Sequence, residues 1–378
     1  MKIAYLSSAS LPSQRANAIQ VMKVCQSLAQ LGHEVTLVGA GNAEIPTWDA
    51  LSDLYGLTAP FQLVFIKPGL LGRRGFAWQA VRHASRLGVD LVITRGLPAA
   101  VVSLLMGLPA ILEMHQMPGG AFGPLWYRWF IRLGGRKLLV PITHALAEAL
   151  IKTYPRTMEG TPLLVAPSGV DLERYVSLPE PAVARQQLGL PDNWSAVCTG
   201  HLYPGRGMDL VLDLARHLPQ INFIWVGGEE KDVAYWKEKA RLAGAANLLL
   251  TGFIPNHDLP LYQAAADALL IPYKPGFTNS GGEDISQVSS PLKVFEYLAS
   301  GRPICSSDLP VLREVFNQSN ALLLPAGEVD AWERALTHLR VHPQDGKRLS
   351  EQAHRDAGQY SWQSRSRMIL TKFQEGLK

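Results

Sequence analysis

Cysteines are scarce in this sequence, and long apolar runs are absent. The 378 residues contain three cysteines, Cys25, Cys198 and Cys305, which are too few and too far apart for a disulfide framework or a metal cluster. We therefore expect buried thiols in a reducing compartment. No run of roughly twenty apolar residues is present, so we expect no transmembrane helix. The opening segment MKIAYLSSAS turns polar after six residues, which predicts a first strand rather than a signal peptide. We therefore expect a cytoplasmic protein.

Acidic residues are scarce in the first half of the chain. Residues 1–166 carry 15 Lys and Arg against 8 Asp and Glu, a net charge of +7. The remainder carries 21 against 24, a net charge of −3, so the modest total of +4 hides an asymmetry. A basic half favours an acidic partner, such as a phospholipid surface or a phosphorylated substrate. Because the basic residues are dispersed and no nucleic-acid-binding module is present, we expect no nucleic-acid partner.

Short runs rich in Val, Ile and Leu alternate with segments of helical period, which is typical of parallel βαβ units. The chain is too long for one ordinary domain, so we predict two doubly wound domains that face each other across a cleft. A Pro-rich segment at residues 167–193 is predicted to link them, and a final helix is expected from Trp362 onward. The predicted strands lie in KIAYLSS, HEVTLVGA, FQLVFIKP, DLVITRG, PAILEMH and KLLVPIT, and then in WSAVCTG, INFIWVGG, NLLLTGF, ADALLIPY, RPICSSD and ALLLPAG.

The first strand-to-helix loop, SSASLPSQRANAIQ, is long and polar. It has no G-x-G-x-x-G, which argues against an ordinary dinucleotide site. Open α/β sheets bind ligands at the carboxyl ends of their strands, so Ser10, Arg15 and Asn17 could contact a substrate. The alternative is a solvated connection in which Asn17 caps the following helix.

Two further loops carry candidate side chains. Glu113 and His115 end an apolar run in ILEMHQMPGG, where the histidine could donate a hydrogen bond to a sugar hydroxyl or phosphate, or transfer a proton. In TGHLYPGRGMDLVL, a turn rich in Gly and Pro could bring backbone N–H groups, His201 and Arg206 against a phosphate. The alternatives are a satisfied core histidine and a simple connector with an exposed arginine.

The stretch SSPLKVFEYLASGRP is predicted to form a helix, with a serine at its N-cap and Gly301 after its end. Lys293 then lies in the first turn, where a cation opposes the positive end of the helix dipole. An anion at the same place would relieve that conflict. The alternative is a solvated ion pair between Lys293 and Glu296, one turn apart.

Taken in order, the motifs LGHEVTLV, MHQ, PSGVDLERY, GHLYPGRGMDLVL, NLLLTGFIPNHDLPLYQAAADALLIPY and SPLKVFEYLASGRPI resemble those of the family 4 retaining glycosyltransferases of the GT-B fold. The resemblance covers nearly the whole chain. It implies an enzyme that moves a sugar from a nucleotide-sugar donor, most commonly a UDP or GDP sugar, to an acceptor hydroxyl with no cofactor and no metal. It also implies an acceptor domain at residues 1–170, a nucleotide-sugar domain at 171–358, and a helix at 359–378 that crosses back to the first domain.

The resemblance implies roles for individual residues. Glu296 matches the acid that binds the nucleotide ribose, Arg206 a basic residue that pairs with the donor diphosphate, and His115 a histidine that contacts the donor sugar near its phosphate. The position of Lys293, one turn before Glu296, places it near the nucleotide as well. The predicted site comprises, as catalytic residues, His115, Arg206 and Lys293; as donor-binding residues, Glu296, His201, Ser290, Leu292 and Glu283; and as acceptor-binding residues, Ser10, Arg15 and Asn17.

Two positions depart from the family pattern. Val288 stands where the family has the first acid of its Glu-x7-Glu motif, although Glu283 and Asp284 lie nearby, and His201 stands where the family commonly has an arginine. Two alternatives therefore stay open. One is a catalytically degenerate nucleotide-sugar-binding scaffold, and the other is a nucleotide-sugar epimerase on the same fold.

The segment FGPLWYRWFIRLGGRK (residues 122–137) mixes aromatic and basic side chains, as does GRRGFAWQAVRHASRLG (residues 72–88). An interfacial helix on anionic lipid would have this composition. A core helix with snorkelling arginines would have it too. The first interpretation predicts a lipid-linked acceptor and peripheral contact with the inner face of the cytoplasmic membrane.

Overall fold

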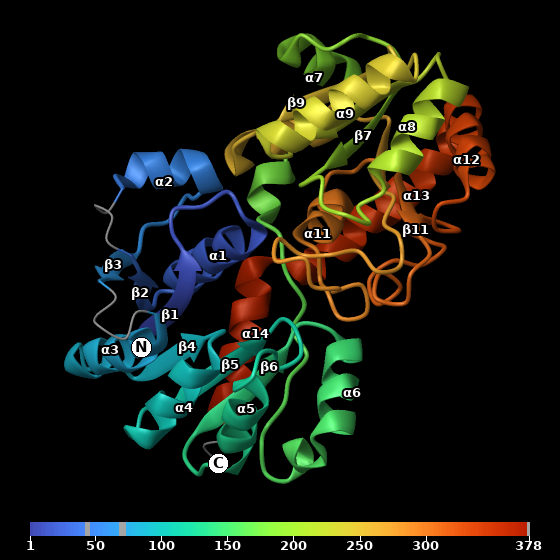
Figure 1. Cartoon of the computed structure of the whole chain (residues 1–378). Helices are drawn as coiled ribbons and strands as arrows, with labels where there is room; N and C mark the ends of the chain where they lie inside the picture. The colour runs from blue at the N-terminus through green and yellow to red at the C-terminus, as the bar shows by residue number, and fades with distance from the viewer. Residues whose placement is uncertain (42–45, 68–72, 376–378) are drawn as a thin grey trace. The chain divides into compact units, whose positions relative to one another are not determined.

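The computed structural model describes residues 1–41, 46–67 and 73–375, apart from the side chains of Arg73 and Arg74. The chain forms two compact units, each built around its own parallel sheet (Figure 1). The first unit comprises Met1–Ser168, Val288–Ser290 and Trp362–Lys378, and the second comprises Gly169–Gln287 and Pro291–Ser361. No helix in the described ranges is long and apolar enough to cross a membrane.

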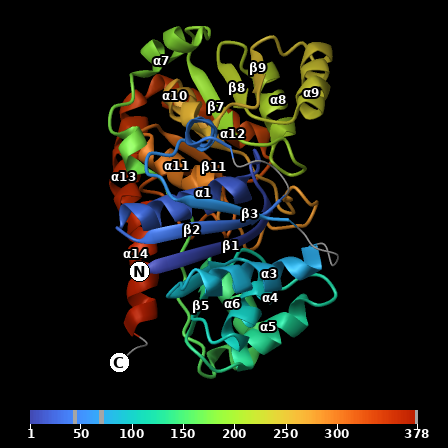
Figure 2. The same ribbon diagram turned by 90° about the vertical axis from the view of Figure 1, so that its left-hand side faces the viewer.

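Six parallel strands form the sheet of the first unit, in the order β3-β2-β1-β4-β5-β6, and Figure 2 shows β1, β2 and β3 side by side. The six strands predicted for this half are confirmed. Their bounds are β1 (Lys2–Ser10), β2 (Glu34–Ala40), β3 (Gln62–Ile66), β4 (Leu91–Thr94), β5 (Ala110–Met114) and β6 (Lys137–Pro141). The helices of the unit are α1 (Ala16–Gln30), α2 (Trp48–Tyr55), α3 (Arg73–Arg86), α4 (Leu97–Leu105), α5 (Gly123–Arg132), α6 (His144–Thr153), the 3-10 turn η1 (Pro155–Met158) and α14 (Trp362–Glu375).

The second sheet repeats this architecture, with the order β12-β11-β10-β7-β8-β9. The six predicted strands are again confirmed, at β7 (Ser195–Thr199), β8 (Asn222–Val226), β9 (Leu248–Gly252), β10 (Ala268–Ile271), β11 (Ile304–Ser307) and β12 (Leu322–Leu324). The helices are η2 (Leu172–Tyr175), α7 (Pro181–Leu188), α8 (Met208–His217), α9 (Glu230–Leu242), η3 (Asn256–Asp258), α10 (Leu259–Ala264), α11 (Leu292–Ala299), α12 (Val329–Val341), α13 (Pro343–Ala357) and η4 (Gly358–Tyr360).

Each sheet has one point at which the strand order reverses. In the first unit β1 pairs with both β2 and β4, and in the second unit β7 pairs with both β8 and β10. The loops that leave such neighbouring strands part toward opposite faces, which opens a crevice at the carboxyl edge. The segments after β1, β4 and β5 and those after β7 and β10 therefore surround the two places where ligands are expected.

The predicted linker at residues 167–193 is wrong. The first unit ends at Ser168, and the rest of the segment folds as part of the second unit, with η2 and α7. Arg185 of α7 is buried and donates to a carboxylate oxygen of Asp267 at 2.8 Å and to the carbonyl of Ala265 at 3.0 Å. Proline and polar residues here mark the beginning of a helix and its buried ion pair rather than a flexible connection.

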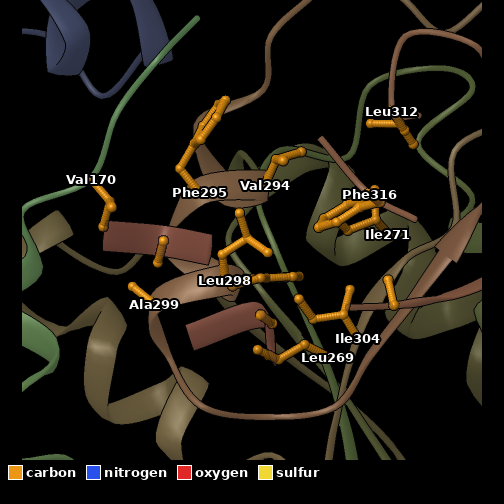
Figure 3. Close-up of a cluster of buried hydrophobic side chains, with 14 of the residues drawn as sticks. Val170, Leu269, Ile271, Val294, Phe295, Leu298, Ala299, Ile304, Leu312 and Phe316 are labelled. Carbon is orange, nitrogen blue, oxygen red and sulfur yellow. The ribbon is translucent and has the colours of Figure 1, made fainter. Parts of the chain in front are cut away.

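Helix α11 lies at the centre of the second unit. Figure 3 shows its Val294, Phe295 and Leu298 gathered with Ile271 of β10 and Ile304 of β11, and all five are buried. Six of the eight residues of α11 are buried. The helix is therefore surrounded by protein on nearly every side, and it holds its remaining side chains in fixed places beside the carboxyl edge of the sheet.

A buried ion pair holds α14 within the first unit. Arg365 and Glu113 are 3% and 1% exposed, and a guanidinium nitrogen lies 2.7 Å from a carboxylate oxygen. The Tyr5 hydroxyl donates to the other carboxylate oxygen at 2.7 Å, and Arg365 also donates to the carbonyls of Ala166 and Pro167. Because each charge has its partner, the pair fixes how α14 packs beside α1 and β6.

We predict that breaking this pair is costly and that removing both charges is less so. Glu113→Gln and Arg365→Met should each lower the free energy of unfolding by about 3–5 kcal/mol, because each leaves a buried charge alone. The double variant should lose much less than the sum of the two. Urea unfolding of all four proteins measures this difference. Additive losses would contradict the pairing.

Candidate functional site

The loops after β7 and β10 interlock at the carboxyl edge of the second sheet. Gly207 has a φ of 86°, and a Cβ at this position would lie 1.8 Å from the carbonyl oxygen of Pro272. Gly205, with a φ of 77°, would likewise clash with the backbone of Phe277. Only glycine permits this close approach, so the loop GHLYPGRG holds a fixed shape against the loop that leads to α11.

Lys293 brings a positive charge into this edge. Its side chain is 8% exposed, and its ammonium lies 3.7 Å from the Cys198 sulfur and 5.1 Å and 5.8 Å from the ring centres of Tyr273 and Trp225. A Cβ at Gly200 would lie 3.1 Å from its nitrogen. Among the residues that the structure describes, no carboxylate pairs with Lys293. A buried ammonium at a helix N-terminus, beside a thiol and two ring faces, is suited to bind an anion.

Arg206 shares the Tyr273 ring with Lys293. Its guanidinium carbon lies 4.6 Å from the ring centre of Tyr273 and 4.8 Å from that of Phe277, and it donates to the Thr278 carbonyl at 2.8 Å. Burial raises the pKa of the Cys198 thiol, and the two cations oppose that shift. The structure thus brings the two predicted catalytic cations of this unit together at the Tyr273 ring. His201 lies in the same loop as Arg206, and its ring stacks on that of Tyr203 with 4.9 Å between the ring centres.

The carboxylate of Glu296 is held by a series of hydrogen bonds between side chains. Gln263, fully buried, donates its amide to a Glu296 carboxylate oxygen at 3.2 Å and accepts from the Tyr175 hydroxyl at 2.9 Å. Burial, and then the nearby Glu296 charge, raise the pKa of Tyr175 well above its ordinary value. Tyr175 therefore keeps its proton and orients the amide, which in turn orients the partly exposed carboxylate.

The predicted start of the Lys293 helix is wrong. The helix α11 begins at Leu292 with Pro291 as its N-cap, and Ser290 instead belongs to the first unit, where its hydroxyl accepts from the Ser168 N–H at 3.0 Å. The solvated ion pair considered for Lys293 is also wrong, because the lysine is buried. The proline correctly indicated where the helix starts, and Ser290 before it forms its hydrogen bonds with Ser168 instead.

The other residues that were predicted to bind the nucleotide-sugar donor do not gather at one place. Leu292, at the first position of α11, is partly exposed, and Glu283 lies in an exposed turn where Asn279 donates to it at 3.0 Å. Val288 lies in the first unit, where its side chain packs on a buried apolar cluster and its carbonyl accepts from the Thr143 hydroxyl at 3.0 Å. An apolar residue suits that packing position, which gives a structural reason for the missing acid.

The first unit collects the other predicted residues at its own strand reversal. Ser10 ends β1, Arg15 is the N-cap of α1 and Asn17 lies in its first turn, and all three are exposed. Asn17 is therefore not the cap. One turn further along α1, the Gln20 amide nitrogen lies 3.1 Å from Nε2 of His115. The structure thus brings the candidate acceptor loop and His115 to the same edge of this sheet.

Sequence reasoning missed Gln263, Gln20 and Arg95. The first two are polar residues inside apolar helical runs, LYQAAADALL and AIQVMKVC, and a glutamine in such a run is a usable indication of a buried hydrogen bond. Arg95 follows the strand LVIT directly, which is the same position relative to its strand as His115. Applying the carboxyl-edge argument to every strand would have found it.

Comparison with protein-family models gives two matches that follow one another along the chain. Residues 18–174 match the model described as Glycosyltransferase Family 4, and residues 195–340 match the model described as Glycosyl transferases group 1. The two matches correspond to the two sheets.

Curated relatives match parts of the chain. A GDP-mannose-dependent alpha-(1-6)-phosphatidylinositol monomannoside mannosyltransferase of Mycolicibacterium smegmatis is 27% identical over 53% of this chain and 53% of its own length. An alpha-galactosylglucosyldiacylglycerol synthase of Streptococcus pneumoniae is 26% identical over 66% of this chain and 66% of its own. The match therefore spans about half the length of the first relative and about two thirds of the second.

Solved structures match over nearly the whole length. Anabaena Alr3699/HepE in complex with UDP and glucose superposes with a TM-score of 0.75 at 18% identity, covering 98% of each chain. Sucrose-phosphate synthase from Thermosynechococcus elongatus superposes with a TM-score of 0.75 at 15% identity, covering 100% of this chain and 99% of that one. These likenesses confirm the predicted GT-B fold class.

We predict that Lys293→Met separates folding from anion binding. Because burying an ammonium without a counter-ion is costly, the free energy of unfolding of the ligand-free variant should stay equal or rise, by up to about 2 kcal/mol. The stabilisation that inorganic pyrophosphate gives the wild type in a thermal melt should disappear. Lys274→Met, which breaks a partly exposed ion pair with Asp209, is the matched control. A Lys293→Met variant that is less stable and still responds to pyrophosphate would show a structural lysine.

Proposed function

Because the chain belongs to glycosyltransferase family 4, we propose that it moves a sugar from a nucleotide-sugar donor to an acceptor hydroxyl. The observation that carries this proposal is the buried Lys293 ammonium beside Arg206 and the N-terminus of α11. A nucleoside diphosphate supplies the missing negative charge at that place, and the Glu296 carboxylate, held by Gln263, accepts hydrogen bonds from the ribose.

The donor is a UDP or GDP sugar. Two findings on other proteins support this choice. The Anabaena structure contains UDP and glucose, and the mycobacterial relative is named for its dependence on GDP-mannose. The side chains described above recognise ribose and diphosphate, which both donors share, so either base is compatible with the site.

The chemistry we propose is retaining and independent of a metal ion. Negative charge develops on the departing diphosphate as the glycosidic bond breaks, and Lys293, Arg206 and the first turn of α11 stabilise that charge in a largely buried site. These fixed positive groups take the part that a divalent cation takes in other sugar transferases. The departing diphosphate then assists attack of the acceptor hydroxyl on the same face of the sugar, so no protein base is required.

A nucleotide-sugar-binding scaffold is the second candidate, and Val288 favours it. That residue packs in the first unit and brings no acid to the site. Binding of the donor without release of free nucleotide would establish the scaffold. A change in the donor sugar without any acceptor would instead indicate an epimerase.

The acceptor we propose is linked to a lipid. Helix α5 buries Tyr127, Phe130 and Ile131, whereas Leu125 and Trp129 on its other side are each 44% exposed. The outer face also carries three further exposed residues, Phe122, Arg128 and Arg132. An outer face of this kind suits the interface of an anionic membrane. Two curated relatives have names that contain a glycolipid: one is a phosphatidylinositol monomannoside mannosyltransferase, and the other is an alpha-galactosylglucosyldiacylglycerol synthase.

Not every basic residue of this segment is available to lipid. The Lys137 ammonium is buried and donates to the carbonyls of Phe130, Ile131 and Leu133 at 2.8, 2.9 and 2.6 Å, so it caps the end of α5. Arg136 lies over the Phe373 ring at 4.1 Å. In the second basic segment, Arg73 and Arg74 lie outside the described side chains, and Trp78 of α3 is 54% exposed.

The direct test of the proposed function is a donor assay with purified protein. UDP and GDP sugars are supplied in the presence of a chelator and then with magnesium, with diacylglycerol or phosphatidylinositol vesicles as acceptors, and both nucleotide release and the anomeric configuration of the product are measured. The expected result is transfer without metal and with retained configuration. Transfer that needs the metal, or an inverted product, would overturn that part of the proposal.

We predict that Glu296→Gln weakens binding of the nucleotide by roughly tenfold or more, because hydrogen bonds between a carboxylate and ribose are lost. The change should leave the affinity for the 2′,3′-dideoxy nucleotide nearly unaltered. Calorimetry with both nucleotides measures the difference, and Gln263→Leu should show the same selectivity to a smaller extent. Glu283→Gln, in an exposed turn, is the control. Equal losses for both nucleotides would exclude the ribose contact.

We predict that Trp129→Ser lowers binding to anionic phospholipid vesicles by roughly tenfold, because an exposed aromatic side chain no longer enters the interface. Leu242→Ser on α9, where the leucine is 68% exposed, is the matched control and should bind as the wild type does. Co-sedimentation at low and high salt measures both effects. Unchanged binding of Trp129→Ser would remove α5 from the membrane contact.

A further inference from the structure

Three polar side chains form a chain of hydrogen bonds at the strand reversal of the first sheet. Nη1 of Arg95, just after β4, donates to Oε1 of Gln20 at 3.1 Å. Nε2 of Gln20 lies 3.1 Å from Nε2 of His115, just after β5. Gln20 is 4% exposed, whereas Arg95 and His115 are only partly buried and reach the carboxyl edge of the sheet.

The direction of each hydrogen bond follows from the groups. A guanidinium has N–H donors and no acceptor, so the amide oxygen of Gln20 must face Arg95. The amide nitrogen therefore faces His115, and since an NH₂ group only donates, Nε2 of the imidazole must accept. A neutral imidazole whose Nε2 accepts carries its proton on Nδ1.

We propose that Arg95 and Gln20 are positioning residues that hold His115 as a neutral imidazole with its proton on Nδ1. In this state His115 donates a hydrogen bond from Nδ1 to a substrate oxygen and does not act as a base. The inference rests on the proposed function for the identity of that substrate, a sugar hydroxyl or a phosphate oxygen. It decides between the two roles, donor and proton carrier, that the sequence left open for this histidine.

The charges around His115 favour the same state. Burial lowers the pKa of His115 well below its ordinary value, and the Arg95 and Arg365 guanidinium groups lower it further. The acidic groups of the neighbourhood are committed elsewhere: Glu113 on β5 to Arg365 and to the Tyr5 hydroxyl. Burial keeps the Tyr5 hydroxyl and the Cys25 thiol of α1 protonated. A second proton on His115 would face two cations and the NH₂ group of Gln20, so the imidazole stays neutral at pH 7.

Restricting His115 to donation has a consequence for the reaction. An Nδ1–H donor strengthens its hydrogen bond as negative charge grows on the oxygen that accepts it, which lowers the barrier without any proton transfer. A group of this type is compatible with a transferase that needs no protein base, as proposed above. The activity should therefore not depend on a group that titrates near the ordinary pKa of histidine.

The test is nitrogen NMR of the 378-residue protein, labelled with ¹⁵N-histidine and free of ligand, over a range of pH. Loss of one set of signals in His115→Gln assigns the residue. The expected wild-type spectrum has Nδ1 protonated and Nε2 unprotonated, with no titration near the ordinary histidine pKa. A proton on Nε2, or a titration in that range, would overturn the proposal in the wild type itself, whether or not any variant folds.

The matched variant is Gln20→Glu, which keeps the shape and reverses the hydrogen bond. A carboxylate accepts from Arg95 and also from His115, so the proton should move to Nε2 and the pKa of His115 should rise. With a donor found in the assay above, kcat should fall roughly tenfold to a hundredfold. Arg95→Met should give a mixture of tautomers, because the amide is then free to turn. A spectrum unchanged in Gln20→Glu would contradict the proposal.

The NMR experiment and the activity assay test the inference and the proposed function independently. Absence of sugar transfer with every donor would remove the proposed function and leave the tautomer measured. A wild-type tautomer other than Nδ1–H in an active transferase would remove the inference and leave the function.

Discussion

An ammonium buried against two aromatic rings is the constraint on which the proposed donor site of the second unit depends. Lys293 is 8% exposed at the second position of α11, and the helix dipole there already points its positive end at the same space. Folding alone gains nothing from this arrangement, because desolvating the charge is costly. An apolar core surrounds α11 and holds the lysine in place, so the stability of that core is what maintains the unfavourable charge. The buried charge lowers the stability of the fold, and binding of an anionic ligand explains why it is there.

The two units use the same topology for different chemistry. Both sheets reverse their strand order once, and both place their polar side chains beside that point. In the second unit the group is cationic and fixed by glycines that allow loops to interlock. In the first unit the group is a network of hydrogen bonds. The buried charges of Glu113 and Arg365 pair with each other. A separate arginine, Arg95, donates to Gln20 and so orients the Gln20 amide toward His115. The cationic group of the second unit suits a diphosphate. The hydrogen-bond network of the first unit suits a neutral imidazole that donates a hydrogen bond.

The fold followed from the sequence because its signals are local. Each buried parallel strand is a short apolar run, and the twelve runs, with helices between them, define two doubly wound sheets. The family resemblance depended on motifs in a fixed order, which also survive as local patterns. The C-terminal helix beyond the last strand was visible for the same reason.

What the sequence did not reveal depends on contacts between distant segments. The serines before Pro291 look like helix caps, but Ser290 pairs with Ser168, 122 positions away. The sequence left open a solvated ion pair between Lys293 and Glu296, and only the packing of the surrounding elements shows that six of the eight residues of α11 are buried. Gln263 with Glu296, and Gln20 with His115, are pairs whose members lie on different elements, so no local spacing predicts them.

Calorimetry with nucleoside, nucleoside monophosphate and nucleoside diphosphate, for uridine and guanosine and in the presence of a chelator, tests the role of Lys293 most directly. Affinity should rise steeply from nucleoside to diphosphate in the wild type, and Lys293→Met should lose this increase but keep the weaker nucleoside binding. A diphosphate that binds no better than its nucleoside, or that binds Lys293→Met as tightly as the wild type, would contradict the claim that the buried ammonium is the centre of a donor site.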